Sequence, residues 1–308
     1  MVWVRNTELS SQAVSKAGIA QTVAMGRLLG LLAAIVLGLN TTFARLAYDA
    51  GSNPVTVLGS RFLACTLAIG IAVVLLGRPT VIPTGSRLPM LRLTAIWFLG
   101  PTCYLSSVVF LPVGLAALLF YSFPLIVAAI SHFQEGARLG PMRVGAFLLA
   151  FTGIVIALSP SLSELDWRGI ALAFVAAVST AVTFILSRRL VSELGVLTFT
   201  MYVSAGSTFL IMGVILLVGG IALPQNTSGW TGLSGAAFGF VVGILAMFTA
   251  IKHVGSAATA MLLNLEPLIS ILAAALVLGE RLTMLQFTGA IMVVSALILS
   301  TRESAKHG

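Results

Sequence analysis

The sequence predicts an all-α integral membrane protein in which ten transmembrane helices form two inverted five-helix repeats. Three observations predict this class. Of the 308 residues, 58% are hydrophobic and only 8% are charged, whereas a soluble domain carries about 25% charged residues. Long uncharged runs follow one another along the chain, and a segment near its middle matches one near its end. The runs are continuous rather than alternating, which indicates helices and excludes a closed β-barrel.

The apolar runs define ten candidate spans, each long enough for a hydrocarbon core of about 30 Å. They lie at residues 27–47, 54–76, 91–111, 113–133, 141–159, 168–187, 197–219, 233–251, 255–278 and 283–300. The first 26 residues lack the apolar core and cleavage site of a signal peptide. We therefore expect residues 1–26 to form a cytoplasmic N-terminal segment that precedes the first span.

Basic residues are distributed unevenly between the two predicted sides of the membrane. With the N terminus inside, thirteen of the 17 Lys and Arg residues fall on the cytoplasmic side: Arg5, Lys16, Arg27, Arg78, Arg87, Arg92, Arg138, Arg143, Arg188, Arg189, Lys252, Arg302 and Lys306. Such an excess sets the orientation of membrane proteins. The sequence therefore predicts a multi-pass protein of the cell (inner) membrane with both termini cytoplasmic. Orientation explains the net charge of +8 better than nucleic-acid binding does.

The chain also contains an internal repeat. The stretches PLIVAAISHFQEGARL, from Pro124, and PLISILAAALVLGERL, from Pro267, match at six of sixteen positions without a gap. This match predicts a first repeat at residues 27–160, a second at 161–301 and a cytoplasmic tail at 302–308. Because five spans is an odd number, the second repeat lies upside down relative to the first. Inverted repeats recur in secondary transporters, where the substrate site lies near the midplane.

Three stretches resemble the drug/metabolite transporter superfamily, specifically its EamA-type exporters. They are LGLNTTFARLAYDAGSNPVTVLGSRFLA (residues 37–64), GIALAFVAAVSTAVTFILSRRL (169–190) and EPLISILAAALVLGERLTMLQFTGAIMVVSALIL (266–299). The resemblance covers nearly the whole chain, and it implies export of small metabolites such as amino acids through a central cavity, without ATP. The chain departs from the family pattern at Phe123-Pro124, where members often carry Glu-Pro.

Glu266 is the deepest acidic residue of the predicted spans, and Pro267 follows it directly. An ionisable residue at this depth usually faces a cavity or a partner and is a functional candidate. Pro267 in addition frees the carbonyl of Leu263 from its helical hydrogen bond. Glu266 is thus a candidate for binding substrate or carrying a coupling proton, although a structural role as a donor or ion-pair partner remains open. Asn264 lies two residues earlier and would point away on a regular helix.

Pro124 occupies the equivalent midpoint of the fourth span. Kinks at proline are common and serve packing, but two symmetry-related kinks at Pro124 and Pro267 are also candidate hinges for alternating access. Tyr121 and Ser122 flank the first of these kinks. Their hydroxyls are candidates for binding either the freed carbonyl or the substrate.

Other polar and aromatic residues of the spans form a second group of candidates. Asn40, in the first span, is either interhelical glue or a ligand. Arg61, in the second, either snorkels to the headgroups with Asp49 as a partner or binds a substrate carboxylate, for which arginine is suited. The aromatic candidates for a cavity wall are Trp97, Tyr104 and Tyr202, although single aromatic residues more often serve the core or the membrane interface.

The absence of other motifs narrows the function. The chain has no G-x-x-x-x-G-K-[ST] loop, no histidines at metal-ligand spacing and no acid–histidine constellation for hydrolysis. We therefore expect no cofactor, no bound metal and no enzymatic activity. The leading prediction is a secondary transporter that exports a small metabolite by alternating access. A flippase or membrane enzyme with a lipid or isoprenoid substrate is the alternative, and a non-transporting scaffold is a third.

The expected partners are the lipid bilayer, a small-molecule substrate and, as an option, a coupling proton. Gly235, Gly239 and Gly243 repeat at a spacing of four in the eighth span. Small residues at this spacing allow helices to approach closely. Packing inside the bundle is the simpler interpretation, and a dimer seam is the alternative, so the sequence predicts a monomer or a weak homodimer.

Overall fold

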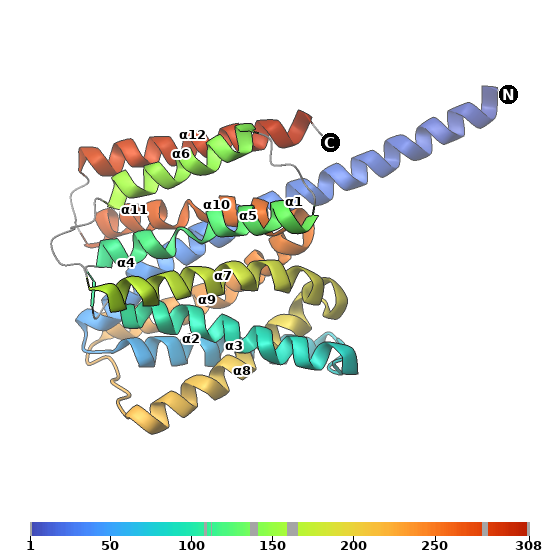
Figure 1. Ribbon diagram of the computed structural model, residues 1–308. Coiled ribbons are helices and arrows are strands. Elements are labelled where there is room, and N and C mark those ends of the chain that lie inside the picture. The colour runs from blue at the N-terminus through green and yellow to red at the C-terminus, as the bar shows by residue number, and fades with distance from the viewer. Residues whose placement is uncertain are drawn as a thin grey trace.

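A computed structural model describes residues 2–107, 110–111, 113–135, 141–158, 166–278 and 283–306. Every regular element in these ranges is a helix (Figure 1). The helices are α1 (Val2–Asp49), α2 (Pro54–Leu75), α3 (Thr84–Ser107), α4 (Val113–Phe120), α5 (Phe123–Glu135), α6 (Pro141–Leu158), α7 (Trp167–Leu194), α8 (Val196–Val218), α9 (Thr227–Val254), α10 (Ser256–Leu263), α11 (Glu266–Leu278) and α12 (Met284–Lys306).

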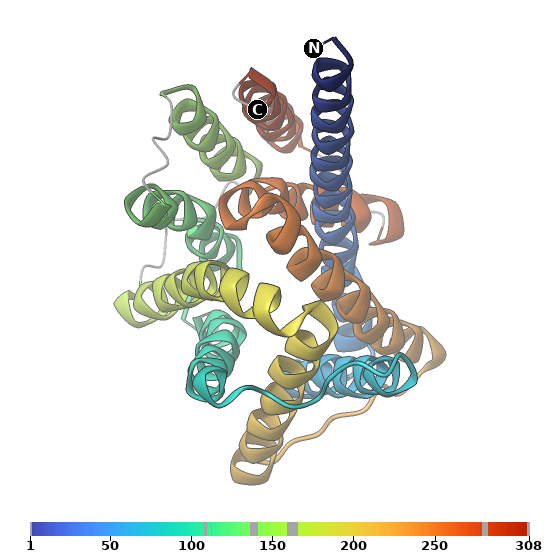
Figure 2. The ribbon, with the colours of Figure 1, turned by 90° about the vertical axis from the view of Figure 1, so that its right-hand side faces the viewer.

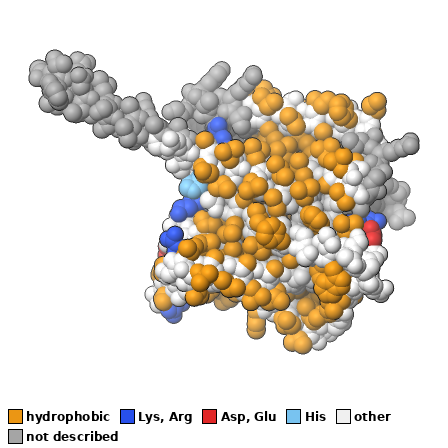
Figure 3. Space-filling model, turned by 180° about the vertical axis from the view of Figure 1, so that it is seen from behind, with side chains coloured by type: hydrophobic (Ala, Val, Ile, Leu, Met, Phe, Trp, Pro, Cys, Tyr) orange, Lys and Arg blue, Asp and Glu red, His pale blue; other side chains and the backbone are white. Residues whose placement is uncertain are grey.

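Each predicted span overlaps one helix or, for the fourth and ninth spans, a pair of short helices. Within the described ranges, six helical segments are long and apolar enough to cross a membrane: Gln21–Asp49, Pro54–Leu75, Trp167–Leu194, Val196–Leu217, Thr227–Val254 and Ser256–Val277. Three shorter apolar helices lie at Leu115–Ser131, Val144–Leu158 and Met284–Leu299. Hydrophobic side chains cover the middle of the surface (Figure 3). These features indicate a multi-pass membrane protein.

The structure differs from the sequence prediction at two boundaries, those of the N-terminal segment and the C-terminal tail. The helix α1 begins at Val2 and projects from the bundle (Figure 1), so the predicted N-terminal segment is largely helical. The predicted junction between the repeats, at residues 160 and 161, lies outside the described residues, as does the Gly-Glu-Arg-Leu motif at 279–282. At the C terminus, α12 continues to Lys306, into the predicted tail.

Four helices of the second half of the chain begin 143 residues after their counterparts in the first half, and α8 begins 142 residues after α2. The pairs of first residues are Thr84 and Thr227 (α3, α9), Val113 and Ser256 (α4, α10), Phe123 and Glu266 (α5, α11), and Pro141 and Met284 (α6, α12). Contacts between the halves follow the same relation. The packing of α1 on α9 has its counterpart in the packing of α3 on α7, while α2 packs on its own counterpart α8 and α6 on its own counterpart α12. The fold therefore has an internal two-fold relation.

Glycines allow the closest of these helix contacts. The helices α6 and α12 run side by side at one margin of the bundle (Figures 1 and 2). A Cβ atom at Gly289 would lie 2.3 Å from the carbonyl oxygen of Gly153, so the two backbones touch. On α9, Gly235 and Gly243 face Phe43 and Leu37 of α1. The glycine repeat of α9 thus packs inside the bundle.

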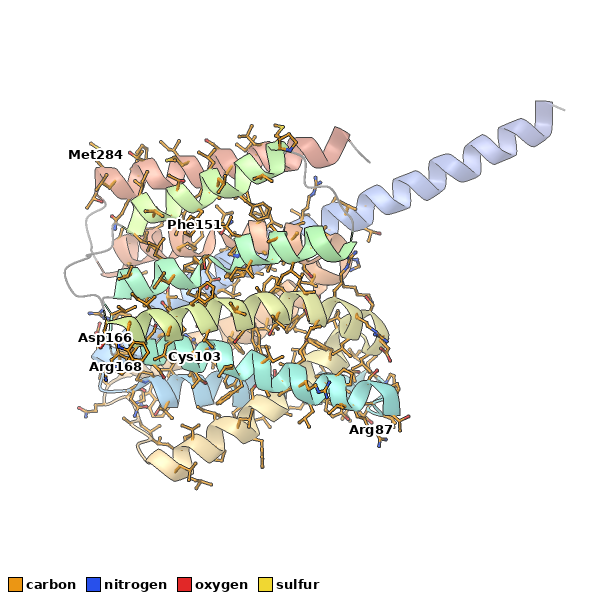
Figure 4. The ribbon with its side chains drawn as sticks, viewed as in Figure 1. Arg87, Cys103, Phe151, Asp166, Arg168 and Met284 are labelled. Atoms are coloured by element: carbon orange, nitrogen blue, oxygen red, sulfur yellow. The ribbon has the colours of Figure 1, made fainter. Side chains whose placement is uncertain are left out.

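The bundle has two distinct ends. Both chain termini lie at one end, which we call the terminal end (Figure 1). Arg87 lies at the terminal end, whereas Asp166, Arg168 and Met284 lie at the opposite end (Figure 4). On the face shown in Figure 3, most Lys and Arg side chains gather at the end from which the N-terminal helix emerges. The basic end is therefore the terminal end.

A loop is tied across each end of the bundle. At the terminal end, the hydroxyl of Tyr202 in α8 donates a hydrogen bond to the carbonyl of Thr80, in the loop between α2 and α3. At the opposite end, the hydroxyl of Ser52, between α1 and α2, donates to the carbonyl of Ala222 at 2.8 Å, in the loop between α8 and α9. Each half of the chain therefore holds a loop of the other half.

Candidate functional site

The fourth and ninth spans are each broken in the interior of the bundle. The breaks lie at residues 121–122, between α4 and α5, and at 264–265, between α10 and α11. Pro124 and Pro267 occupy the second position of the helix that follows each break, where the missing N–H group has no helical partner to lose. The proline therefore starts a new helix, so the chain is interrupted two residues earlier rather than kinked at the proline.

The polar side chains of the two breaks bond locally. The hydroxyl of Ser122 donates to the carbonyl of Leu119 at 2.7 Å, which satisfies one of the acceptors at the end of α4. Asn264 is buried, and its Nδ2 atom lies 3.6 Å from the sulfur of Met261. Both residues shape the breaks, and the structure directs their side chains to nearby helix atoms rather than to Glu266.

Glu266 is the first residue of α11, so its carboxyl group lies at a helix N terminus, where partial positive charge favours an anion. The helix α1 closes on this point, because a Cβ atom at Gly38 would lie 2.7 Å from the carbonyl oxygen of Glu266. The side chain of Glu266 is enclosed by helices yet only half-buried.

Two residues of the first half of the chain interact with this carboxyl group. The hydroxyl of Tyr121 and the guanidinium of Arg61 both lie close enough to interact electrostatically with the carboxyl group of Glu266. Arg61 resembles Glu266 in being enclosed by the bundle and half-buried. No ion pair within 4 Å joins the two among the described residues. The site therefore holds opposite charges that attract each other without contact.

Arg61 points inward rather than toward the headgroups. Its Nη2 atom lies 3.4 Å from the carbonyl oxygen of Asn40, and its Nε atom is buried without a hydrogen-bond partner in the described structure. Asn40 in turn donates from Nδ2 to the carbonyl of Ala236 at 2.6 Å, while its Oδ1 atom is buried and unpaired. Asp49, the expected partner of Arg61, instead pairs with Arg45 at 2.9 Å. Asn40 thus joins α1 to α9 and also borders the site.

Aromatic rings surround the charged groups. Tyr104 packs on Phe120 with ring centroids 4.9 Å apart, and Phe120 packs on Tyr121 at 5.3 Å. Tyr104 lies within electrostatic range of Glu266, and Tyr48 within range of Arg61. Tyr48 and Phe120 were not among the residues predicted from the sequence. No pattern around them distinguishes them from ordinary aromatic residues of a span.

Two aromatic candidates lie away from Glu266. Trp97 packs on the ring of Phe248, with centroids 5.8 Å apart, and so belongs to the core between α3 and α9. Tyr202 bonds the carbonyl of Thr80 at the terminal end. The structure therefore assembles Glu266, Arg61, Tyr121, Tyr104 and Asn40 from the predicted set and separates Trp97 and Tyr202 from them.

The arrangement brings together groups that can bind a ligand reversibly. Among the described residues, no group of three or more His, Cys, Asp or Glu side chains could hold a metal ion. The anion at Glu266 and the cation at Arg61 come from different halves of the chain. Unpaired buried polar atoms such as Arg61 Nε and Asn40 Oδ1 are costly unless a ligand or water pairs with them. The site can therefore accept a small dipolar molecule.

Comparison with known proteins finds similar chains. Residues 24–159 and 167–302 each match the EamA-like transporter family. An uncharacterized transporter of Archaeoglobus fulgidus is 27% identical over 214 residues, which cover 70% of this chain and 76% of that protein. The uncharacterized transporter YvbV of Bacillus subtilis is 25% identical over 290 residues, which cover 89% and 91%.

The fold is also shared with a solved protein. A crystal structure of 19% sequence identity superposes with a TM-score of 0.76 and covers 92% of this chain and 98% of the other. At this identity the likeness concerns the fold alone. The family match covers most of the chain in two copies, which agrees with the two-fold relation between its helices. The chain therefore belongs to the EamA-like transporter family, and this membership indicates a transporter rather than an enzyme.

Proposed function

We propose that the protein is a secondary transporter that exports a small dipolar metabolite, an amino acid or a related compound, by alternating access. The observation that carries this proposal is the pair of opposite charges at the broken helices. Glu266 and Arg61 attract each other but form no contact ion pair, and the Nε atom of Arg61 is unpaired. A substrate that carries an ammonium and a carboxylate group satisfies both residues at once.

The roles of the two residues follow from their chemistry. The carboxylate of Glu266 accepts hydrogen bonds from the ammonium group of the substrate, or carries a coupling proton when the site is empty. The guanidinium of Arg61 donates to the substrate carboxylate in a charge-assisted hydrogen bond. Removing a charge from water is costly unless it is paired. A solute with only one of the two charges leaves the other residue unpaired and binds more weakly.

In this proposal the chain crosses the inner membrane ten times, and the terminal end of the bundle faces the cytoplasm. The support is that both termini and most visible basic side chains share that end (Figures 1 and 3), because excess Lys and Arg face the cytoplasm. The two halves, 27–160 and 161–301, act as inverted repeats with the site between them, as in other carriers. Pro124 and Pro267 start the half-helices that would move as the ends open in turn.

Flux into liposomes tests the proposal. Purified protein is reconstituted and offered free amino acids, the corresponding carboxamides, which lack the carboxylate, and the corresponding desamino acids, which lack the ammonium group. We expect flux of amino acids with at least tenfold weaker competition by either analogue, since an unpaired buried charge costs more than about 1.4 kcal/mol. Equal competition by all three classes, or no flux of any of them, would contradict the proposal.

A further inference from the structure

The residues of the site have equivalents in the other half of the chain that differ from them in chemistry and in exposure. Glu266 corresponds to Phe123, because each is the first residue of the helix after a break. Tyr104 corresponds to Met247 by the same spacing of 143 residues, and Arg61, the eighth residue of α2, corresponds to Val203, the eighth residue of α8. Phe123, Val203 and Met247 are at most 2% exposed, whereas Glu266, Arg61 and Tyr104 are only half-buried. One half of the interior is charged and accessible, and the equivalent half is uncharged and closed.

Aromatic contacts fill the closed half. Phe123 of α5 packs on Phe184 of α7, with ring centroids 5.4 Å apart. Phe199 of α8 meets Phe248 of α9 edge to face at 4.8 Å, and Trp97 of α3 packs on the same ring. Phe184, Phe199 and Phe248 are at most 1% exposed. These four phenylalanines are here called the aromatic seal.

Phe184, Phe199 and Phe248 of the aromatic seal lie on the terminal side of the site, and Phe123 lies at the break, where its ring also meets Phe120 and Tyr121. The helix α7 starts at Trp167, next to the Asp166 of the opposite end, and runs toward the terminal end, where α8 begins (Figures 1 and 4). Phe199 is in the first turn of α8 and therefore lies near the terminal end. Arg61 is in the second turn of α2, which starts at the opposite end beside Asp49 and Ser52. The site and the aromatic seal thus divide the interior between the two ends.

We propose that Phe123, Phe184, Phe199 and Phe248 form the gate that closes the substrate path at the terminal end, and that this structure is a state closed at that end. The inference rests on the proposed transport cycle. Contacts between α5 and α7, and between α3 and α9, join the two halves of the chain. Opening the terminal end separates these halves locally, so these two contacts exist only while that end is closed. Phe199 supports the ring of Phe248 from within the same half of the chain. Weakening these contacts favours the alternative state.

Sided cysteine labelling measures which end is open. The reporter is Tyr104→Cys, placed in a chain whose native cysteines are replaced by Cys65→Ala and Cys103→Ala. Separate chains with Ser192→Cys or Ser228→Cys mark the two ends, because both serines are exposed and lie at the terminal and opposite ends respectively. A membrane-impermeant maleimide is applied to intact cells and to inside-out vesicles. In the parent chain we expect the reporter to react from the side on which Ser228→Cys reacts.

The gate variants are Phe184→Ala and Phe199→Ala, with Phe209→Ala as the matched control. Phe209 lies on α8 with Phe199 but is 79% exposed. Each gate variant is expected to raise reporter labelling from the Ser192 side about tenfold, the factor for loss of an aromatic contact in one of two states. The control leaves labelling from both sides unchanged. If either alanine variant fails to fold, Phe184→Leu and Phe199→Leu replace it and give a smaller shift in the same direction.

The outcomes separate the gate from the proposed function. Labelling of the parent reporter mainly from the Ser192 side, or equal labelling of folded gate and control variants, overturns the gate even if amino acids are transported. The expected labelling shifts without flux of any dipolar solute support the gate and contradict the proposed substrate. Reversed marker labelling contradicts the predicted topology, while the ratio of reporter sides relative to the markers still tests the gate.

Discussion

The two halves of the interior share a backbone and differ in chemistry. Glu266 and Phe123 occupy equivalent positions. Each is the first residue of the helix after a break, and each is followed directly by a proline. Glu266 keeps accessible surface and interacts with Arg61 and Tyr121, whereas Phe123 is 2% exposed and packs on Phe184. The two breaks therefore have the same backbone arrangement, and the side chain at the first residue after each break decides whether that region holds a charged group or a packed ring that excludes water.

The largest expected effect is that of Glu266→Gln, which removes the charge that distinguishes the two halves. Loss of the carboxylate that pairs with the ammonium group of the substrate costs about 2–5 kcal/mol. The flux, compared at equal amounts of reconstituted protein, should therefore fall roughly thirtyfold or more. The measurement is amino-acid flux in liposomes and its pH profile. The matched control is Glu193→Gln, since Glu193 accepts a hydrogen bond from Ser86 at the terminal end. Wild-type flux and pH dependence in Glu266→Gln would leave the carboxyl group a structural role only.

Arg61→Gln tests the second charge of the binding half. We expect about a tenfold rise in KM for amino acids and little change in the weak competition by carboxamides, because only the former present a carboxylate to Arg61. Arg61→Lys should not restore the KM, since a point charge lacks the planar donor fork. Arg45→Gln is the control, because Arg45 forms an exposed pair with Asp49. A KM that rises equally for both substrate classes would contradict carboxylate binding.

Gly289→Ala tests whether the two halves are tightly packed where α6 crosses α12. The added Cβ atom would lie 2.3 Å from the carbonyl oxygen of Gly153, so α6 and α12 must separate. Overpacking of this kind destabilises by about 1–3 kcal/mol, and the melting temperature in detergent should fall accordingly. Gly145→Ala on α6 is the control, because nothing lies within 4 Å of a Cβ atom there. An unchanged melting temperature would show that this crossing is not tight.

The smallest effects concern the loops tied across the two ends. Tyr202→Phe removes the hydrogen bond to Thr80 at the terminal end, and Ser52→Ala removes the bond to Ala222 at the opposite end. Each loss is worth about 0.5–1.5 kcal/mol. We expect the sided labelling ratio of the Tyr104→Cys reporter to shift toward the terminal side with Tyr202→Phe and away from it with Ser52→Ala. Shifts in the same direction would contradict a reciprocal role of the two loops.

Much of the fold could be predicted because each span is a continuous apolar run, which leaves few choices of element or boundary. The breaks were harder to predict. A proline shows that a helix is disturbed, but whether it kinks or starts anew at residues 121–122 and 264–265 depends on packing against other helices. The packing role of the glycine repeat of α9 was predicted correctly, because a spacing of four places the three glycines on one face of the helix.

The candidate site could be predicted only in part. Glu266 stands out by depth alone, since an acid in an apolar run needs an explanation. Arg61 was ambiguous, because a long side chain can fold inward or reach the headgroups from the same helix position. The spacing of Arg45 and Asp49, four residues apart, already favoured their pairing over that of Asp49 with Arg61. Trp97 and Tyr202 were included on residue type, which says nothing about the face of the helix.

The packing of α2 on α8 and of α6 on α12 sets an element against its own counterpart. In a two-fold homodimer, the same patch of each subunit meets itself across the axis. This chain contains such a self-complementary interface within one polypeptide. Two identical subunits would carry the same residue at every equivalent position, and each would keep either the acid or the phenylalanine. Because the copies are joined, Glu266 and Phe123 can differ, which allows the proposed roles of binding and sealing to be divided between them.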